Sequence, residues 1–88
     1  MTLRIETTSD GRTPTLRLIG RIESESLDEL RAQVGRHHSR LQLDLRDVTL
    51  VDVVVVRFLI ACEAEGIDLL YCAPYIREWM NRERSRED

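Results

Sequence analysis

Residues 41–66 read LQLDLRDVTLVDVVVVRFLIACEAEG, and two hydrophobic periods follow one another within them. Residues 41–46 alternate strictly between leucine and a polar residue, which is the pattern of a half-buried strand. The three leucines therefore share one face of the predicted strand. Because the other face is polar, we expect helices to cover only one side of the sheet here.

The next segment, residues 48–60, allows two interpretations. Four consecutive valines at residues 53–56 favour a strand by propensity. Asp52, however, stands directly before them as a good helix N-cap, and no turn residue follows until Gly66. The sequence therefore predicts a strand end and then a helix over residues 53–65, although each valine costs this helix about 0.5 kcal/mol relative to alanine.

The residues before this segment predict a hairpin. Strands are expected over residues 3–8 and 15–22, because apolar and polar residues alternate there. Residues 9–14 between them form a turn cluster with a glycine and a proline. Gly20 is expected to mark a bulge or the end of the second strand.

A helix is predicted after the hairpin. Ser26 and Glu29 fit a capping box, in which each side chain satisfies a backbone N–H that would otherwise lack a partner. Leu27 and Leu30 recur at helical spacing, and Gly35 is expected to end the helix. This segment therefore supplies the first helix of the fold.

The C-terminal part predicts one more strand and one more helix. The strand covers residues 67–73, and the helix begins at Pro74. We expect a single domain over residues 1–80, followed at residues 81–88 by a charged tail that is frayed or disordered. The predicted order is β-β-α-β-α-β-α, an α/β fold with a mixed four-stranded sheet and about three helices.

The composition of the chain argues against several classes of function. A chain of 88 residues with a net charge of −3 is one domain and lacks the positive surface that nucleic-acid binding requires. No apolar run is long enough to cross a bilayer, and no signal sequence is apparent, so we expect no membrane insertion. Cys62 and Cys72 lack the spacing of a disulfide framework. The cytoplasm is the expected location.

No group of residues predicts catalysis. His37 and His38 are adjacent, with no cysteine or carboxylate at a metal-ligand spacing, and are expected in a solvated loop. Asp44, Asp47 and Asp52 could suggest a magnesium cluster. A strand face explains the first of these aspartates and a helix cap the last, so we expect no metal, no cofactor and no enzymatic activity.

A family resemblance rests on residues 20–22 (GRI) with the helix after them, and on residues 43–52 (LDLRDVTLVD) leading into an apolar helix. Over residues 3–80 the chain resembles the STAS domain, the fold of bacterial anti-sigma-factor antagonists. In regulatory members, a hydroxyl residue two positions after this aspartate is phosphorylated by a partner kinase, the anti-sigma factor. Val54 stands at that phospho-acceptor position. Because valine has no oxygen to accept a phosphoryl group, the resemblance implies that this switch cannot operate here.

The predicted helix after Asp52 is apolar on nearly all sides, and a domain of this size cannot easily enclose such a helix. We therefore interpret four of its residues as a candidate interface with a partner: Val53, Val54, Arg57 and Ala61. The alternative is that the valines pack beneath the neighbouring loop at residues 48–51.

Three functional hypotheses follow. The first is a non-catalytic interaction module that resembles an anti-sigma-factor antagonist and binds an anti-sigma kinase, a STAS paralogue or a second copy of itself. The second is a small cytosolic STAS subunit of an ABC-type membrane transport complex, a role that some single-domain relatives fill. The third, from another class, is a sensor that binds a small molecule or nucleotide between the Asp52 loop and the second predicted helix.

Overall fold

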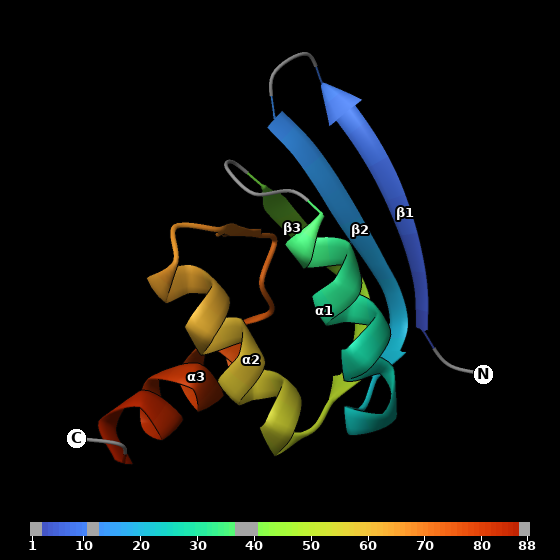
Figure 1. Ribbon diagram of the computed structural model, residues 1–88. Helices are drawn as coiled ribbons and strands as arrows, with labels where there is room; N and C mark the ends of the chain where they lie inside the picture. Colours follow the sequence, from blue (N-terminus) through green and yellow to red (C-terminus); the bar gives the residue numbers. More distant parts are fainter. Residues whose placement is uncertain (1–2, 11–12, 37–40, 87–88) are drawn as a thin grey trace.

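The computed structural model describes residues 3–10, 13–36 and 41–86. Its elements follow the predicted order β-β-α-β-α-β-α (Figure 1). They are β1 (Leu3–Asp10), β2 (Thr13–Ile22), a short 3₁₀ helix η1 (Ser24–Ser26), α1 (Leu27–Gly35), β3 (Gln42–Val51), α2 (Val53–Ala64), β4 (Asp68–Leu70) and α3 (Pro74–Arg86). His37 and His38 lie outside the described residues.

The strands form one mixed sheet in the order β1-β2-β3-β4. β1 and β2 pair antiparallel as the predicted hairpin, whereas β2, β3 and β4 run parallel. The hairpin ladder extends beyond the predicted strand ends, as far as the pair Asp10 and Thr13. β4 is shorter than the predicted residues 67–73, because Tyr71 adopts a positive φ of 56° that ends the extended backbone.

Gly20 lies where the register between β2 and β3 shifts. Gly20 pairs with Val48 and Arg21 pairs with Leu50, so β3 contains one extra residue at this point. The φ of Gly20 is 98°, a conformation that glycine adopts without the steric cost of a Cβ. The predicted irregularity is therefore present at Gly20, with the extra residue on the neighbouring strand β3.

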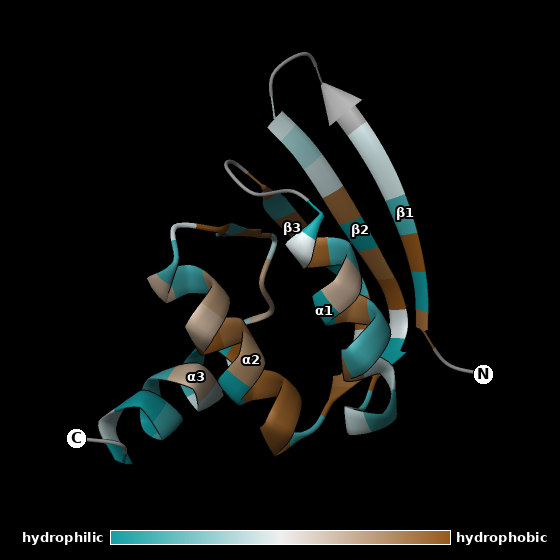
Figure 2. Cartoon of the chain, in the orientation of Figure 1, coloured by the Kyte–Doolittle hydropathy of each residue, from teal (hydrophilic) through white to brown (hydrophobic). Residues whose placement is uncertain are grey.

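The apolar core lies between one face of the sheet and the helices. Leu16 and Leu18 of β2, together with Leu43 and Leu45 of β3, are at most 2 % exposed. Helices α1 and α2 lie in front of this sheet in Figure 1, and hydrophobic residues concentrate in the first half of α2 (Figure 2). The core is thus closed by the helices that follow the second and third strands.

The other face of the sheet carries charged side chains. Arg17 forms an ion pair with Asp47, and the guanidinium of Arg46 lies 4.1 Å from the centre of the Tyr71 ring. The side chains of Arg17 and Arg46 are 42 % and 54 % exposed, so they remain in contact with solvent. This exposed polar face agrees with the expectation that helices cover one side of the sheet.

Helix α3 continues through Arg86, so residues 81–86 are helical and the prediction of a frayed or disordered tail from residue 81 is wrong for them. Ile76 and Met80 are fully buried, and Glu83, one turn further along the same stripe, is 5 % exposed. Its carboxylate accepts a hydrogen bond from Nε of Arg57 at 3.3 Å. A charged residue thus extends the inward face of the helix because α2 supplies its counter-charge.

Candidate functional site

Asp52 organises the start of α2. Its backbone is extended (φ −115°, ψ 179°), and its Oδ1 accepts a hydrogen bond from the backbone N–H of Val55 at 3.0 Å, which is the geometry of an N-cap. Its Oδ2 accepts a second bond, from the backbone N–H of Ser24 at 3.1 Å. One carboxylate therefore fixes both the first turn of α2 and the loop that follows β2.

Replacing Asp52 with alanine is expected to lower the free energy of unfolding by about 1–2 kcal/mol, since two backbone N–H groups lose their acceptor. Asp52→Asn should lose less, because the amide oxygen still accepts. Urea denaturation followed by circular dichroism measures both effects. As a control, Asp28→Ala removes an exposed carboxylate from the first turn of α1 and should cost only a few tenths of a kcal/mol. A smaller loss for Asp52→Ala than for the control would contradict the capping role.

Ser26 does not cap a helix with its side chain, so the predicted capping box with Glu29 is wrong. Ser26 has helical dihedral angles (φ −91°, ψ −6°) because it is the last residue of η1, whose backbone turns into α1 without a break. An N-cap side chain needs an extended backbone at its own residue to reach the N–H groups ahead of it. The preceding 3₁₀ turn removes that geometry.

The four valines at the start of α2 divide into two pairs. Val53 and Val54 are 37 % and 41 % exposed, whereas Val55 and Val56 are fully buried. Because successive helical residues are separated by about 100°, four consecutive residues surround the axis and cannot all face the core. The chain therefore presents Val53 and Val54 on the surface and uses the other two valines as core.

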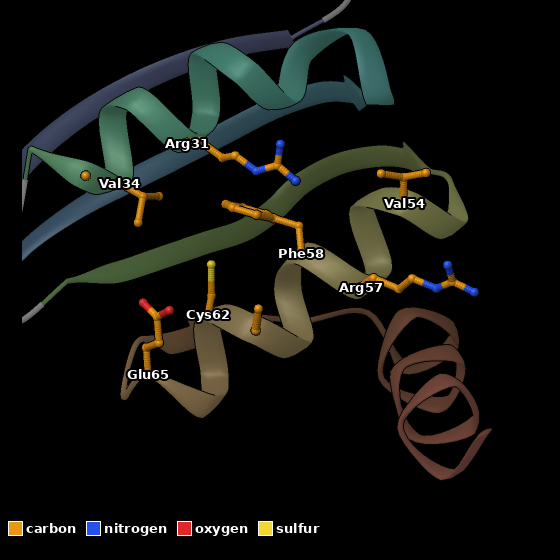
Figure 3. A pocket seen from close by; sticks show the side chains of 9 residues that line it. Arg31, Val34, Val54, Arg57, Phe58, Cys62 and Glu65 are labelled. Carbon is orange, nitrogen blue, oxygen red and sulfur yellow. The ribbon is translucent and has the colours of Figure 1, made fainter. Parts of the chain in front are cut away.

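A groove of about 570 Å³ lies between α1 and α2 (Figure 3). Three of the four candidate interface residues, Val54, Arg57 and Ala61, line it, whereas Val53 does not. Phe58 and Cys62 point into it from α2 (Figure 3). Most of the predicted interface residues therefore line an apolar groove, which the sequence pattern did not predict.

Cys62 is only 4 % exposed, and burial raises the pKa of its thiol to about 12, with a smaller contribution from the charge of Glu65. At neutral pH this thiol therefore stays protonated, and a protonated thiol is a poor nucleophile. The groove thus offers a small apolar side chain at this position.

Arg57 has a structural role that the sequence did not indicate. Its side chain is 59 % exposed, yet its Nε is bonded to the buried carboxylate of Glu83 on α3. The neighbouring Glu63 accepts further bonds from Arg77 and Arg84 of α3, at 2.8–3.0 Å. Ion pairs therefore fasten α3 to α2 beside the candidate surface.

The three aspartates considered as a cation site have other partners. Asp44 accepts a bond from the backbone N–H of Arg46 at 2.9 Å, Asp47 pairs with Arg17, and Asp52 caps α2. Across residues 3–10, 13–36 and 41–86, no three histidine, cysteine or carboxylate side chains lie together in an arrangement that could hold a metal ion. Within the same ranges, no helix is both long and apolar enough to cross a membrane.

A structural comparison and a family profile both relate this chain to STAS domains. A solved structure described as the anti-sigma factor antagonist SpoIIAA in its unphosphorylated form superposes with a TM-score of 0.62, at 15 % identity and over 96 % of both chains. No curated protein matches the chain in sequence. The profile of the family described as "Mlab, STAS domain" matches residues 5–69, which is well over half of the chain. The chain therefore belongs to the STAS domain family.

Proposed function

We propose that this protein is a non-catalytic interaction module that binds another protein through the surface at the start of α2. The observation that carries the proposal is the pair of exposed valines, Val53 and Val54, in the first turn of a helix that Asp52 holds in place. Side chains of this kind release ordered water when a partner covers them, at roughly 25 cal/mol per Å² of apolar area. Because a rigid helix presents them, little conformational entropy is lost on binding.

The proposed binding is not switched by phosphorylation of this surface. Val54 stands two residues after the capping aspartate, at the position that corresponds to the phosphorylated hydroxyl residue of regulatory STAS domains. A valine methyl cannot accept a phosphoryl group. Control of the interaction would therefore come from the state or the abundance of the partner.

The likeness to an anti-sigma factor antagonist supports one of two partners, an anti-sigma kinase or a second STAS protein. We propose the cytoplasm as the place of this interaction, because Cys62 and Cys72 are free thiols. A membrane transport ATPase is the alternative partner and would be recognised by the same experiment.

Affinity capture from the source organism tests this proposal with three baits: the wild type, Val54→Asp and Tyr75→Asp. The last is a matched control, because Tyr75 is also an exposed apolar residue (50 %) but lies on α3. We expect an anti-sigma kinase or STAS protein with the wild type and the control, and at least roughly tenfold less of it with Val54→Asp, since an interface carboxylate without a partner costs more than about 1.4 kcal/mol.

Equal recovery with all three baits would overturn the proposed surface. Capture of a transport ATPase in a Val54-dependent manner would keep the surface and replace the partner. Circular dichroism of each bait establishes that the helices are intact before the comparison is made.

A further inference from the structure

One stripe of side chains on α2, continued by the C-cap residue Glu65, borders the groove. Val54, Phe58, Ala61 and Glu65 follow one another at spacings of four, three and four residues, which places them on one side of the helix. All four line the groove between α1 and α2. Val54, Ala61 and Glu65 are exposed and Phe58 is partly buried, so the stripe is available to a second helix.

The two ends of this groove carry opposite charges (Figure 3). Arg31 of α1 extends over Phe58, 5.8 Å from the ring centre, and its guanidinium lies toward the end marked by Val54 and Arg57. Glu65 marks the opposite end. In the part of the chain that the structure describes, neither Arg31 nor Glu65 forms an ion pair, whereas Arg57 is bonded to Glu83. The groove therefore has a positive end and a negative end.

We infer that the occupant of this groove is a second copy of the same chain, with its α2 antiparallel to the first. This inference rests on the proposed function and names the partner of the same surface. Antiparallel pairing reverses the stripe, so Glu65 of each copy meets the Arg31 end of the other. It also places the large Phe58 of one copy against the small Ala61 of the other. Each favourable contact then occurs twice, as a two-fold symmetric interface requires.

The dimer is expected to be of modest affinity. Nine residues line the groove, whereas a stable interface uses roughly 20–30 residues on each side. We therefore expect dissociation in the micromolar range, and a dissociation constant that rises with salt because partly exposed charges at the two ends are screened.

Sedimentation velocity over a range of protein concentrations tests the inference with charge reversals at the two ends. Arg31→Glu places two glutamates at each contact and Glu65→Arg places two arginines there, so each single variant should weaken the dimer at least roughly tenfold. The double variant restores opposite charges at both contacts and should dimerise like the wild type. An equimolar mixture of the two single variants should also form a dimer, because every contact then joins a glutamate to an arginine.

Glu29→Arg is the matched control. Glu29 is exposed on α1 and lies outside the groove, so reversal of its charge should leave the dissociation constant unchanged. A wild type that stays monomeric up to about 1 mM, or single variants that fail to pair when mixed, would overturn the inference. If the wild type is monomeric while Val54→Asp still loses its captured partner, self-pairing is wrong and the proposed function stands. If the dimer forms but no other protein is lost with Val54→Asp, the second copy is the partner of this surface and the anti-sigma kinase is not.

Discussion

Val55→Asp is expected to unfold the domain, whereas Val54→Asp, one residue earlier, leaves it folded. Val55 is fully buried, and burying a carboxylate without a counter-charge costs several kcal/mol. A chain of 88 residues has a total stability of about 4–13 kcal/mol. The cost is therefore a large fraction of the whole.

Val54 differs because 41 % of it is exposed and because it lies in the first turn of α2. An aspartate there remains hydrated and interacts favourably with the positive end of the helix dipole. Thermal and urea denaturation of both variants measures the contrast. Similar stabilities for the two variants would show that the valines are not divided between surface and core.

Met80→Ala is expected to lower the free energy of unfolding by about 2–5 kcal/mol, the range for truncating a buried methionine. Met80 is fully buried in α3, so its loss leaves a cavity on the side that faces the core. The matched control is Glu78→Ala, which removes only the ion pair with Arg82, between side chains that are both 71 % exposed. That change should cost at most about 0.5 kcal/mol.

Urea denaturation of the two variants measures the difference. If Met80→Ala were as stable as Glu78→Ala, the packing of α3 against the rest of the domain would be contradicted. A large loss of stability in Met80→Ala would also show that α3 stabilises the domain up to residue 80, where the predicted domain ends.

The order of the elements could be predicted because each carries a local signal. The alternating leucines of β3 identify a half-buried strand, and Asp52 before an uninterrupted apolar run identifies the start of α2. Gly20 signals the irregular pairing between β2 and β3, because a glycine inside a strand pattern often marks a bulge. These features depend on residues that are neighbours in sequence.

The errors arise where distant residues decide the outcome. The N–H of Ser24 is satisfied by Asp52, 28 residues away, and Ser26 continues the turn rather than capping a helix. The charged sequence of residues 81–86 predicts a solvated tail. In the structure these residues are helical, and Arg57 of α2 neutralises Glu83. A pattern of charges in sequence does not show which of them will meet across two helices.

The sequence predicts only part of the candidate surface, because the rest depends on contacts between distant residues. The sequence indicates that α2 is too apolar to be enclosed, but it does not show which valines face outward. The groove depends on how α1 lies against α2, and Arg31, Val34 and Phe58 enter the site only through that arrangement. The sequence assigns the candidate surface to α2 alone, and only the structure shows which residues of α1 line the groove beside it.

The most direct test of binding through α2 is a titration of the protein, labelled with ¹³C at its valine methyl groups, with its captured partner. We predict that the NMR signals of Val53 and Val54 shift or broaden on binding, while those of the buried Val55 and Val56 change little. Shifts confined to valines elsewhere in the chain, with the signals of Val53 and Val54 unchanged, would contradict the claim that this protein binds its partner through the first turn of α2.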